Sequence, residues 1–280
     1  MAGTALVLGG GGYTAQAWQA GVLAGLAGAG VDLTTADLVL GTSAGAVLGT
    51  RLASGEPPDR LYGRELEGGR DGLDLRISLA ATARFLWAVH GTRDPGRARR
   101  RLGRLARSVR TGVGEDEVLT AVASLTGVRE WPGRALRVAA VDVSTGAVGT
   151  FDAGGGVDLP RAVAASCAVP GIWPPIAADG RRWMDGGVRS TTNADLVRGY
   201  GRVVVLAPLP RPVGPGPGAA DHVAELAAGG TEAVLLTPDR ASRRAFGRNP
   251  LDHARRPAAA RAGHAQAAAA AGAVAAVWHG

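Results

Sequence analysis

The sequence contains no lysine, so arginine supplies all 31 of its basic residues. The 24 acidic residues leave a formal net charge of +7, a balance that favours acidic partners such as nucleic acid or anionic lipid. The lack of lysine, with 44 glycines and abundant alanine, is also typical of a coding sequence rich in G and C. That bias explains the arginines without any acidic partner, so charge alone predicts none.

Cysteine is nearly absent as well. Cys167 is the single cysteine, which excludes an internal disulfide and fits a reducing compartment. One cysteine and five scattered histidines give no spacing typical of metal ligands. We therefore predict neither a metal site nor a cofactor.

No apolar run reaches the roughly 20 residues that a membrane-spanning helix needs. The first apolar run, residues 5–8, stops in glycines, has no basic residues before it and is too short for a signal peptide. The 46% hydrophobic content is typical of a globular protein, although only 4% of the residues are aromatic. We expect a cytoplasmic protein.

The order of patterns along the chain predicts an α/β fold. Two units of apolar strand, glycine turn and helix follow one another within residues 4–53, which favours a parallel sheet. Further predicted elements are a hairpin around 144–146, a helix over 159–168 and strands at 181–184 and 203–207. We predict one domain over 1–280, with a mainly parallel central sheet and helices on both sides. Its core spans 4–207 with a helical insertion at about 56–130, and 208–280 adds a Pro/Gly loop, a last strand near 234–237 and a C-terminal helix.

The stretch GTSAG, residues 41–45, follows a predicted strand and matches the nucleophile elbow G-x-S-x-G. In such an elbow a serine sits on a tight, strained turn, and glycines two positions away avoid collisions. Ser43 is therefore a candidate nucleophile. A glycine-rich turn whose serine only caps the next helix explains the motif equally well.

A second glycine turn, Gly9 to Gly12, also follows a strand and precedes a helix. Parallel strands place both turns at one end of the sheet, where free amides of Gly10, Gly11 and Gly12 can form an oxyanion hole. Residues 10–15 also fit the dinucleotide fingerprint G-x-G-x-x-A, with Asp32 about twenty residues further on. A phosphate-binding loop is therefore the first alternative.

Asp185-Gly186-Gly187 is the third glycine motif. The carboxylate of Asp185 follows a short predicted strand and can project from the end of the sheet. By itself the tripeptide is more typical of an ordinary Asp-Gly turn.

Taken in order, GGGG, GTSAG and DGG resemble the patatin-like phospholipase family. The segments ASCAVPG (165–171) and RWMDGGV (182–188) are also similar to blocks of that family, and the resemblance covers most of residues 4–207. It implies hydrolysis of a lipid or other acyl ester by a Ser-Asp dyad, without histidine. Ser43 would be the nucleophile, Asp185 the general base and Gly10, Gly11 and Gly12 the oxyanion hole.

The chain departs from this family after the glycine run. Many members carry Arg or Lys followed by Gly, where this sequence has Thr14 and Ala15. The departure puts substrate preference and activity in question and leaves a catalytically degenerate, lipid-binding relative as a second alternative. A Ser-His-Asp triad with His222 or His253 and Asp195 is a third, although several strands normally precede a triad elbow and only one precedes the strand that leads into this elbow.

The Arg97–Arg110 segment is rich in arginine, and on a helix its apolar residues share one face. It can be a solvated surface helix or can make peripheral contact with an anionic membrane surface. It lacks the interleaved aromatic residues of nucleic-acid binders, so we expect no nucleic acid partner. Core packing is the default for the six tryptophans, and Trp173, beside the aspartate block, is the candidate for a pocket contact. The pattern gives no oligomeric state.

Overall fold

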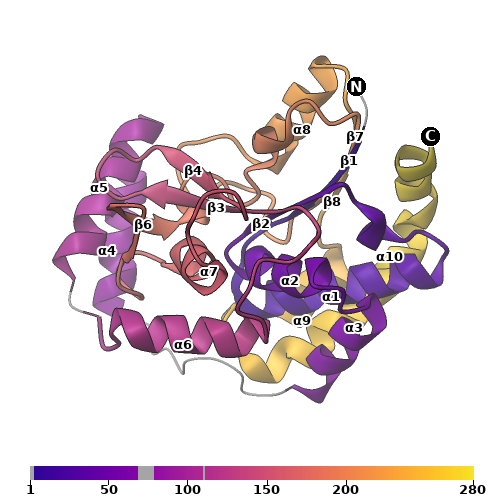
Figure 1. The fold of residues 1–280 in the computed structure, drawn as a ribbon, viewed down its shortest axis with the longest axis horizontal. Coiled ribbons are helices and arrows are strands. Elements are labelled where there is room, and N and C mark those ends of the chain that lie inside the picture. Colours follow the sequence, from indigo (N-terminus) through magenta and orange to yellow (C-terminus); the bar gives the residue numbers. More distant parts are fainter. Residues whose placement is uncertain (1–2, 69–78, 110) are drawn as a thin grey trace.

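The computed structural model describes residues 3–68, 79–109 and 111–280. Its sheet has the strand order β5-β6-β3-β2-β1-β7-β8, with β4 paired to β3 (Figure 1). The strands are β1 (Thr4–Leu8), β2 (Leu38–Thr42), β3 (Leu136–Asp142), β4 (Val148–Phe151), β5 (Ile176–Ala178), β6 (Arg181–Asp185), β7 (Arg202–Leu206) and β8 (Glu232–Leu236). Five neighbouring strands of this sheet run parallel: β3, β2, β1, β7 and β8. The other pairings, β4 with β3, β6 with β3 and β5 with β6, are antiparallel. The predicted mainly parallel sheet is confirmed.

Helices occupy most of the remaining described chain. They are α1 (Gly12–Gly28), α2 (Ala44–Ala53), α3 (Pro58–Glu67), α4 (Leu79–His90), α5 (Pro95–Ser108), α6 (Glu115–Thr126), α7 (Leu159–Cys167), α8 (Ala219–Ala228), α9 (Arg240–Phe246) and α10 (Arg256–His279), with short 3-10 turns η1 (Leu33–Thr35), η2 (Gly186–Val188), η3 (Ala194–Val197) and η4 (His253–Arg255). None of the described helices is long and apolar enough to cross a bilayer.

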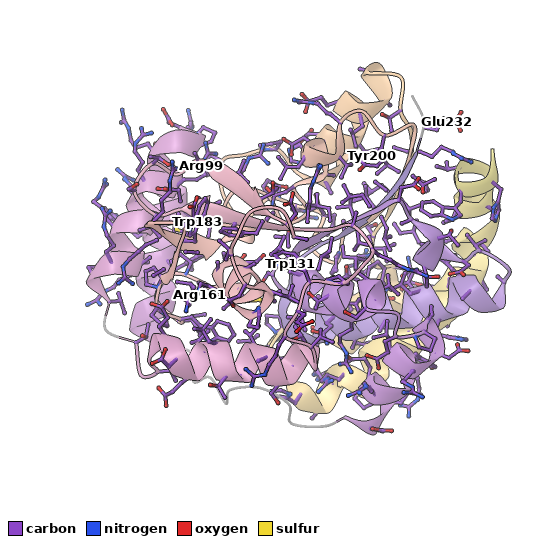
Figure 2. The ribbon with its side chains drawn as sticks, viewed as in Figure 1. Arg99, Trp131, Arg161, Trp183, Tyr200 and Glu232 are labelled. Atoms are coloured by element: carbon purple, nitrogen blue, oxygen red, sulfur yellow. The ribbon has the colours of Figure 1, made fainter. Side chains whose placement is uncertain are left out.

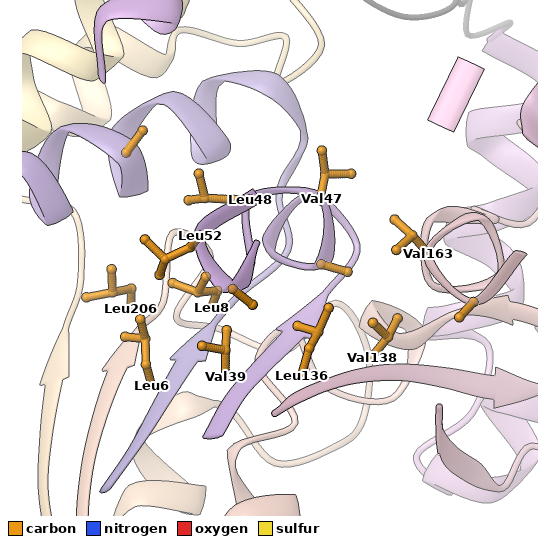
Figure 3. Close-up of a cluster of buried hydrophobic side chains, with 14 of the residues drawn as sticks. Leu6, Leu8, Val39, Val47, Leu48, Leu52, Leu136, Val138, Val163 and Leu206 are labelled. Carbon is orange, nitrogen blue, oxygen red and sulfur yellow. The ribbon is translucent and has the colours of Figure 1, made fainter. Parts of the chain in front are cut away.

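The central strands bury side chains on both faces of the sheet. Leu6, Leu8 and Val39 point to the face covered by α1, α2, α7 and α10, where Figure 3 shows them packed near Leu48 and Leu52. The alternate side chains of β1 and β2 pack on the other face against α8 and η3. This alternation follows from the two-residue period of a strand. Helices therefore cover both faces, as predicted.

The predicted helical insertion contains α3, α4, α5 and α6, while residues 69–78 lie outside the described part of the chain. The α4–α5 pair packs on the ends of β3 and β6 through Val141 and Met184. On the other side, Arg161 of α7 joins α6 to the sheet edge by bonding Glu115 and the carbonyl of Ala177 (Figure 2). The insertion thus frames the end of the sheet that carries the glycine turns.

The backbones of helices α1 and α10 approach each other closely where they cross, because a glycine of each helix faces the backbone of the other. A Cβ on Gly21 would lie 2.0 Å from the carbonyl oxygen of Ala260, and one on Gly263 would lie 2.2 Å from that of Trp18. This packing seats the C-terminal helix on the first helix of the chain, next to the Gly9 to Gly12 turn.

Candidate active site

Ser43 lies at the turn between β2 and α2 with a strained backbone. Its φ is 54° and its ψ is −122°, values that a residue with a Cβ adopts only when its surroundings impose them. A Cβ on Gly41 would lie 2.5 Å from the Cα of Ala46, and one on Gly45 would lie 2.1 Å from the carbonyl oxygen of Leu8. The glycines of GTSAG are therefore required by close backbone contact, and the turn has the shape of a nucleophile elbow.

Asp185 ends β6, and its carboxylate reaches Ser43. The Ser43 hydroxyl donates to Oδ2 of Asp185 at 2.7 Å, and the Gly187 amide donates to Oδ1 at 2.6 Å. Strand β3 brings the two residues together because it pairs with β2 on one side and with β6 on the other. Each carboxylate oxygen of Asp185 thus accepts one hydrogen bond, and the candidate nucleophile Ser43 donates one of the two.

Burial changes the basicity of this carboxylate. Because Asp185 is only 3% exposed, desolvation raises its pKa to about 6, against the opposing effect of the bonds from Ser43 and Gly187. At neutral pH the group is mostly ionised. It binds a proton more tightly than an ordinary aspartate, which suits a general base.

Two buried side chains that the sequence interpretation did not assign hold this pair in place. The Ser166 hydroxyl accepts from the Ser43 amide at 2.8 Å and donates to the Ala139 carbonyl at 2.6 Å. Asn193, at φ 51°, donates through Nδ2 to Thr42 and to the Gly186 carbonyl, both at 3.2 Å. Ser166 therefore holds the backbone of the candidate nucleophile, and Asn193 ties β2 to the loop after Asp185.

The glycine turn lies against Ser43, but its amides differ in availability. The Gly10 amide donates to the Thr191 carbonyl at 2.8 Å, so it is already bonded within the fold. A Cβ on Gly10 would lie 3.0 Å from the Cβ of Ser43, so this residue permits close approach. Gly11 and Gly12, at the first turn of α1, donate no backbone hydrogen bond to any described residue. An oxyanion hole in this turn would use the amides of Gly11 and Gly12.

Thr14 and Ala15, which stand where many family members have Arg or Lys followed by Gly, are buried, and the C-terminal part of the chain covers Thr14. Thr14 is fully buried, and its amide donates to the Pro250 carbonyl at 3.2 Å. Its hydroxyl reaches the same carbonyl at 3.5 Å. A Cβ on Gly12 would lie 2.7 Å from this oxygen. The segment around Pro250 thus closes over the glycine turn, leaving no room for a long basic side chain at position 14.

An apolar pocket of about 110 Å³ opens beside the Ser43 hydroxyl. Its lining includes Trp173, as predicted, and further side chains from α1, α2, α6, the 167–173 segment and the C-terminal chain: Tyr13, Gln16, Val47, Leu125, Cys167, Val169, Ile172 and Leu251. Burial, with a smaller contribution from the nearby Asp185 charge, raises the pKa of the Cys167 thiol. The thiol therefore stays neutral and does not compete with Ser43 as nucleophile.

The histidines do not reach Ser43. His222 is buried with its Nε2 3.3 Å from Asp195 Oδ1, and Arg189 holds the other oxygen of that carboxylate at 2.6 Å. Burial lowers the pKa of His222 despite Asp195. His253 stacks on Tyr13 at 4.0 Å. The Asp195–His222 pair considered for a triad therefore exists, but it contacts Arg189 and Ser190 rather than the candidate nucleophile.

The position of Asp32 does not favour a dinucleotide site. Its side chain caps η1, which comes before β2, whereas the glycine turn comes after β1. Because β1 and β2 are parallel, Asp32 lies near the start of the strands, at the opposite end of the sheet from Gly10 to Gly12. It is too far along the sheet to bind a ribose held by that turn.

Comparison with known proteins agrees with this geometry. The family model described as Patatin-like phospholipase matches residues 6–198, well over half of the chain. The chain belongs to the patatin-like phospholipase family. Within this family its match runs from β1 through η3 and includes Ser43, Asp185, Ser166 and Asn193.

Solved structures and curated proteins add less. VipD from Legionella pneumophila is 14% identical with a TM-score of 0.40, over 74% of this chain and 50% of that one. The type III effector protein ExoU is 18% identical with a TM-score of 0.41, over 95% of this chain and 53% of that one. The chain thus spans about half the length of both. No curated protein matches it significantly.

Proposed function

We propose that the protein is a serine acyl hydrolase that cleaves lipid or related acyl esters with a Ser43-Asp185 dyad. The observation that carries the proposal is the 2.7 Å hydrogen bond from Ser43 to a buried carboxylate whose pKa is raised, at a strained elbow facing an apolar pocket. Family membership supports the same chemistry. We also propose that the chain forms one domain, because β7 and β8 extend the sheet of the matched region and α10 packs in the same core.

The proposed cycle uses these groups alone. The Ser43 oxygen attacks the ester carbonyl while its proton passes to Asp185, and the amides of Gly11 and Gly12 stabilise the oxyanion. Asp185 then protonates the leaving alcohol, which leaves an acyl-Ser43 intermediate. Water then attacks the acyl group while its proton passes to Asp185. The tetrahedral intermediate collapses, Asp185 returns that proton to the departing Ser43 oxygen, and the carboxylic acid is released.

Labelling with a fluorophosphonate probe tests the dyad. The wild-type protein should be labelled and should release fatty acid from at least one ester class in a lipid panel. Ser43→Ala should abolish both, and Asp185→Asn should lower the labelling rate by at least about a hundredfold. Ser54→Ala, a change at an exposed serine, is the matched control and should behave as wild type.

Other outcomes would favour the alternatives. A folded protein that is never labelled and hydrolyses no ester would be a degenerate, lipid-binding relative. Stabilisation against heating by NAD without labelling would favour the dinucleotide interpretation.

We also propose that α5 meets an anionic lipid surface. Its exposed arginines recur at three- and four-residue steps and so form one stripe: Arg97, Arg100, Arg104 and Arg107. None of the four pairs with an acidic side chain among the described residues. On the adjacent α4, Trp87 is 68% exposed and Leu86 is 48% exposed, and Arg101 lies over the Trp87 ring at 5.1 Å. Cationic and aromatic side chains on one surface are typical of contact with anionic headgroups. Arg110, which ends the predicted segment, lies outside the described residues.

A further inference from the structure

Gln16 presents a polar side chain in a fixed orientation to a pocket whose lining is mainly apolar. Gln16 belongs to the first turns of α1, is only 5% exposed and lines the pocket together with Ser43. Among the other lining residues, Val47, Leu125 and Val169 offer no hydrogen-bonding side chain. A polar group in such a site sets what kind of ligand fits it, because ligand pockets orient their occupants through a few such groups.

The chemistry of its neighbour settles which way the Gln16 amide points. Its nitrogen donates to Oε1 of Glu65 at 3.0 Å, and an ionised carboxylate can only accept. Oε2 of Glu65 accepts from Nε of Arg256 at 2.7 Å, and both members of this ion pair are almost fully buried. The pair holds Glu65 still, so the amide nitrogen of Gln16 stays on that side.

The amide oxygen of Gln16 must then point away from Glu65. It accepts no hydrogen bond from any described residue. It nevertheless keeps some accessible surface, so it is not sealed inside the protein. Since the pocket is the open space that Gln16 lines, its Oε1 is an acceptor presented to whatever occupies that space.

The size of the pocket limits where a matching donor can lie on a substrate. The volume of about 110 Å³ is smaller than a cavity of about 150 Å³ that takes benzene, with six carbons. The pocket therefore encloses only the first four or five carbons of an acyl chain, with any remainder leaving through the mouth. A donor that reaches Gln16 must lie close to the ester carbonyl.

We propose that the pocket selects acyl groups with a hydroxyl a few carbons from the ester carbonyl, and that this hydroxyl donates to Oε1 of Gln16. The inference rests on the proposed function and names its substrate class. A plain alkyl chain would displace water from Oε1 without replacing its hydrogen bond, which disfavours binding. A hydroxyacyl chain restores the bond and keeps the apolar contacts.

The test compares p-nitrophenyl 3-hydroxybutyrate with p-nitrophenyl butyrate. In the wild-type protein kcat/KM should be at least about tenfold higher for the hydroxy ester, the size of one well-placed hydrogen bond. Gln16→Leu and the equally long Gln16→Met should bring the ratio close to one, mainly by losing activity on the hydroxy ester. Val47→Ala changes the same pocket without removing the acceptor and should keep the preference. A wild-type ratio near one, or an unchanged ratio in both Gln16 variants, would overturn the inference.

Binding to the Ser43→Ala protein separates this inference from the proposed function. In an NMR titration, methyl 3-hydroxybutyrate should bind at least about tenfold more tightly than methyl butyrate. If the wild-type protein hydrolyses no ester and yet this difference is present, the hydrolase proposal fails and the pocket inference stands. Equal binding of the two esters, with hydrolysis intact, refutes the pocket inference alone.

Discussion

Ser43 and Asp185 are 142 residues apart in the chain and share one short hydrogen bond. In the proposed mechanism the serine depends on its partner, because a serine hydroxyl by itself is a weak nucleophile at neutral pH. The partner in turn depends on burial, since desolvation makes this aspartate more basic than one in water. The chemistry of the site is therefore a property of the pair and of the apolar surroundings.

The raised pKa of Asp185 predicts the pH dependence of activity. The carboxylate must be ionised to accept the Ser43 proton, so kcat/KM for an uncharged ester should rise with pH through about 6 and level off above 7. A pH–rate profile with a p-nitrophenyl ester measures this limb. Full activity at pH 4.5 would show that Asp185 does not act as the base.

Ser166 offers a test of positioning. In Ser166→Ala the Ser43 amide loses its acceptor and the Ala139 carbonyl loses its donor, both at the elbow. We expect kcat to fall by about 10- to 100-fold with KM nearly unchanged, because the pocket lining stays intact. Steady-state kinetics beside Ser54→Ala measure the split. A change in KM alone would assign Ser166 to substrate binding.

At the scale of the elements, the sequence predicted those with strong local signals. The runs that form β1 and β2 are continuous and buried, and the helix predicted over 159–168 is α7, whose N-terminus Asp158 caps by accepting from the Arg161 amide. The short strand β5 and the helices α8 and α9 were not predicted, because they are brief or carry weak patterns. Strand β6 was predicted, but its antiparallel pairing was not, since pairing direction depends on distant chain segments.

In the candidate site, too, the sequence predicted the residues with a local signal and missed those that depend on distant contacts. The motifs led to Ser43 and Asp185 because glycines mark both turns. Ser166 and Asn193 act through partners that are distant in sequence, such as Ala139 and Thr42, and nothing local reveals those contacts. The bond between the Gly10 amide and Thr191 likewise becomes visible only in the folded chain.

Two glycine substitutions test the packing of the elbow. Gly45→Ala would place a Cβ 2.1 Å from the Leu8 carbonyl and should destabilise the protein by roughly 3 kcal/mol or more while abolishing activity. Gly63→Ala, inside α3 with open space around it, should stabilise it by about 0.5–1 kcal/mol. Denaturant unfolding of the two variants measures both effects. Equal stabilities would mean that the elbow tolerates side chains.

At the scale of the whole molecule, α5 lies at the left of Figure 1, whereas α9 lies near the lower centre and α10 toward the right. This separation makes a charge-matched comparison possible, because α9 and the loop after it carry four exposed arginines of their own: Arg240, Arg243, Arg244 and Arg248. The two sets differ in their surroundings, since α5 has the exposed Trp87 beside it.

Vesicle binding uses that comparison. Replacing Arg97, Arg100, Arg104 and Arg107 with Gln should weaken binding to phosphatidylglycerol-containing vesicles by about a hundredfold or more, since each basic residue near the surface contributes about 1 kcal/mol. Replacing the four arginines of the α9 region should leave binding largely intact. Co-sedimentation with and without the anionic lipid measures both. An equal loss of vesicle binding in the two variants would show that net charge alone, and not the position of the arginines, determines binding.

The contact between Thr14 and Pro250 joins positions that are 236 residues apart. In a growing chain, Ser43 and the first glycine turn are therefore synthesised long before the segment that closes over the turn. The pocket wall around Leu251 and the crossing of α1 by α10 come from the same late segment. The candidate site therefore takes its final shape only after the segment that contains Pro250, Leu251 and α10 has been synthesised.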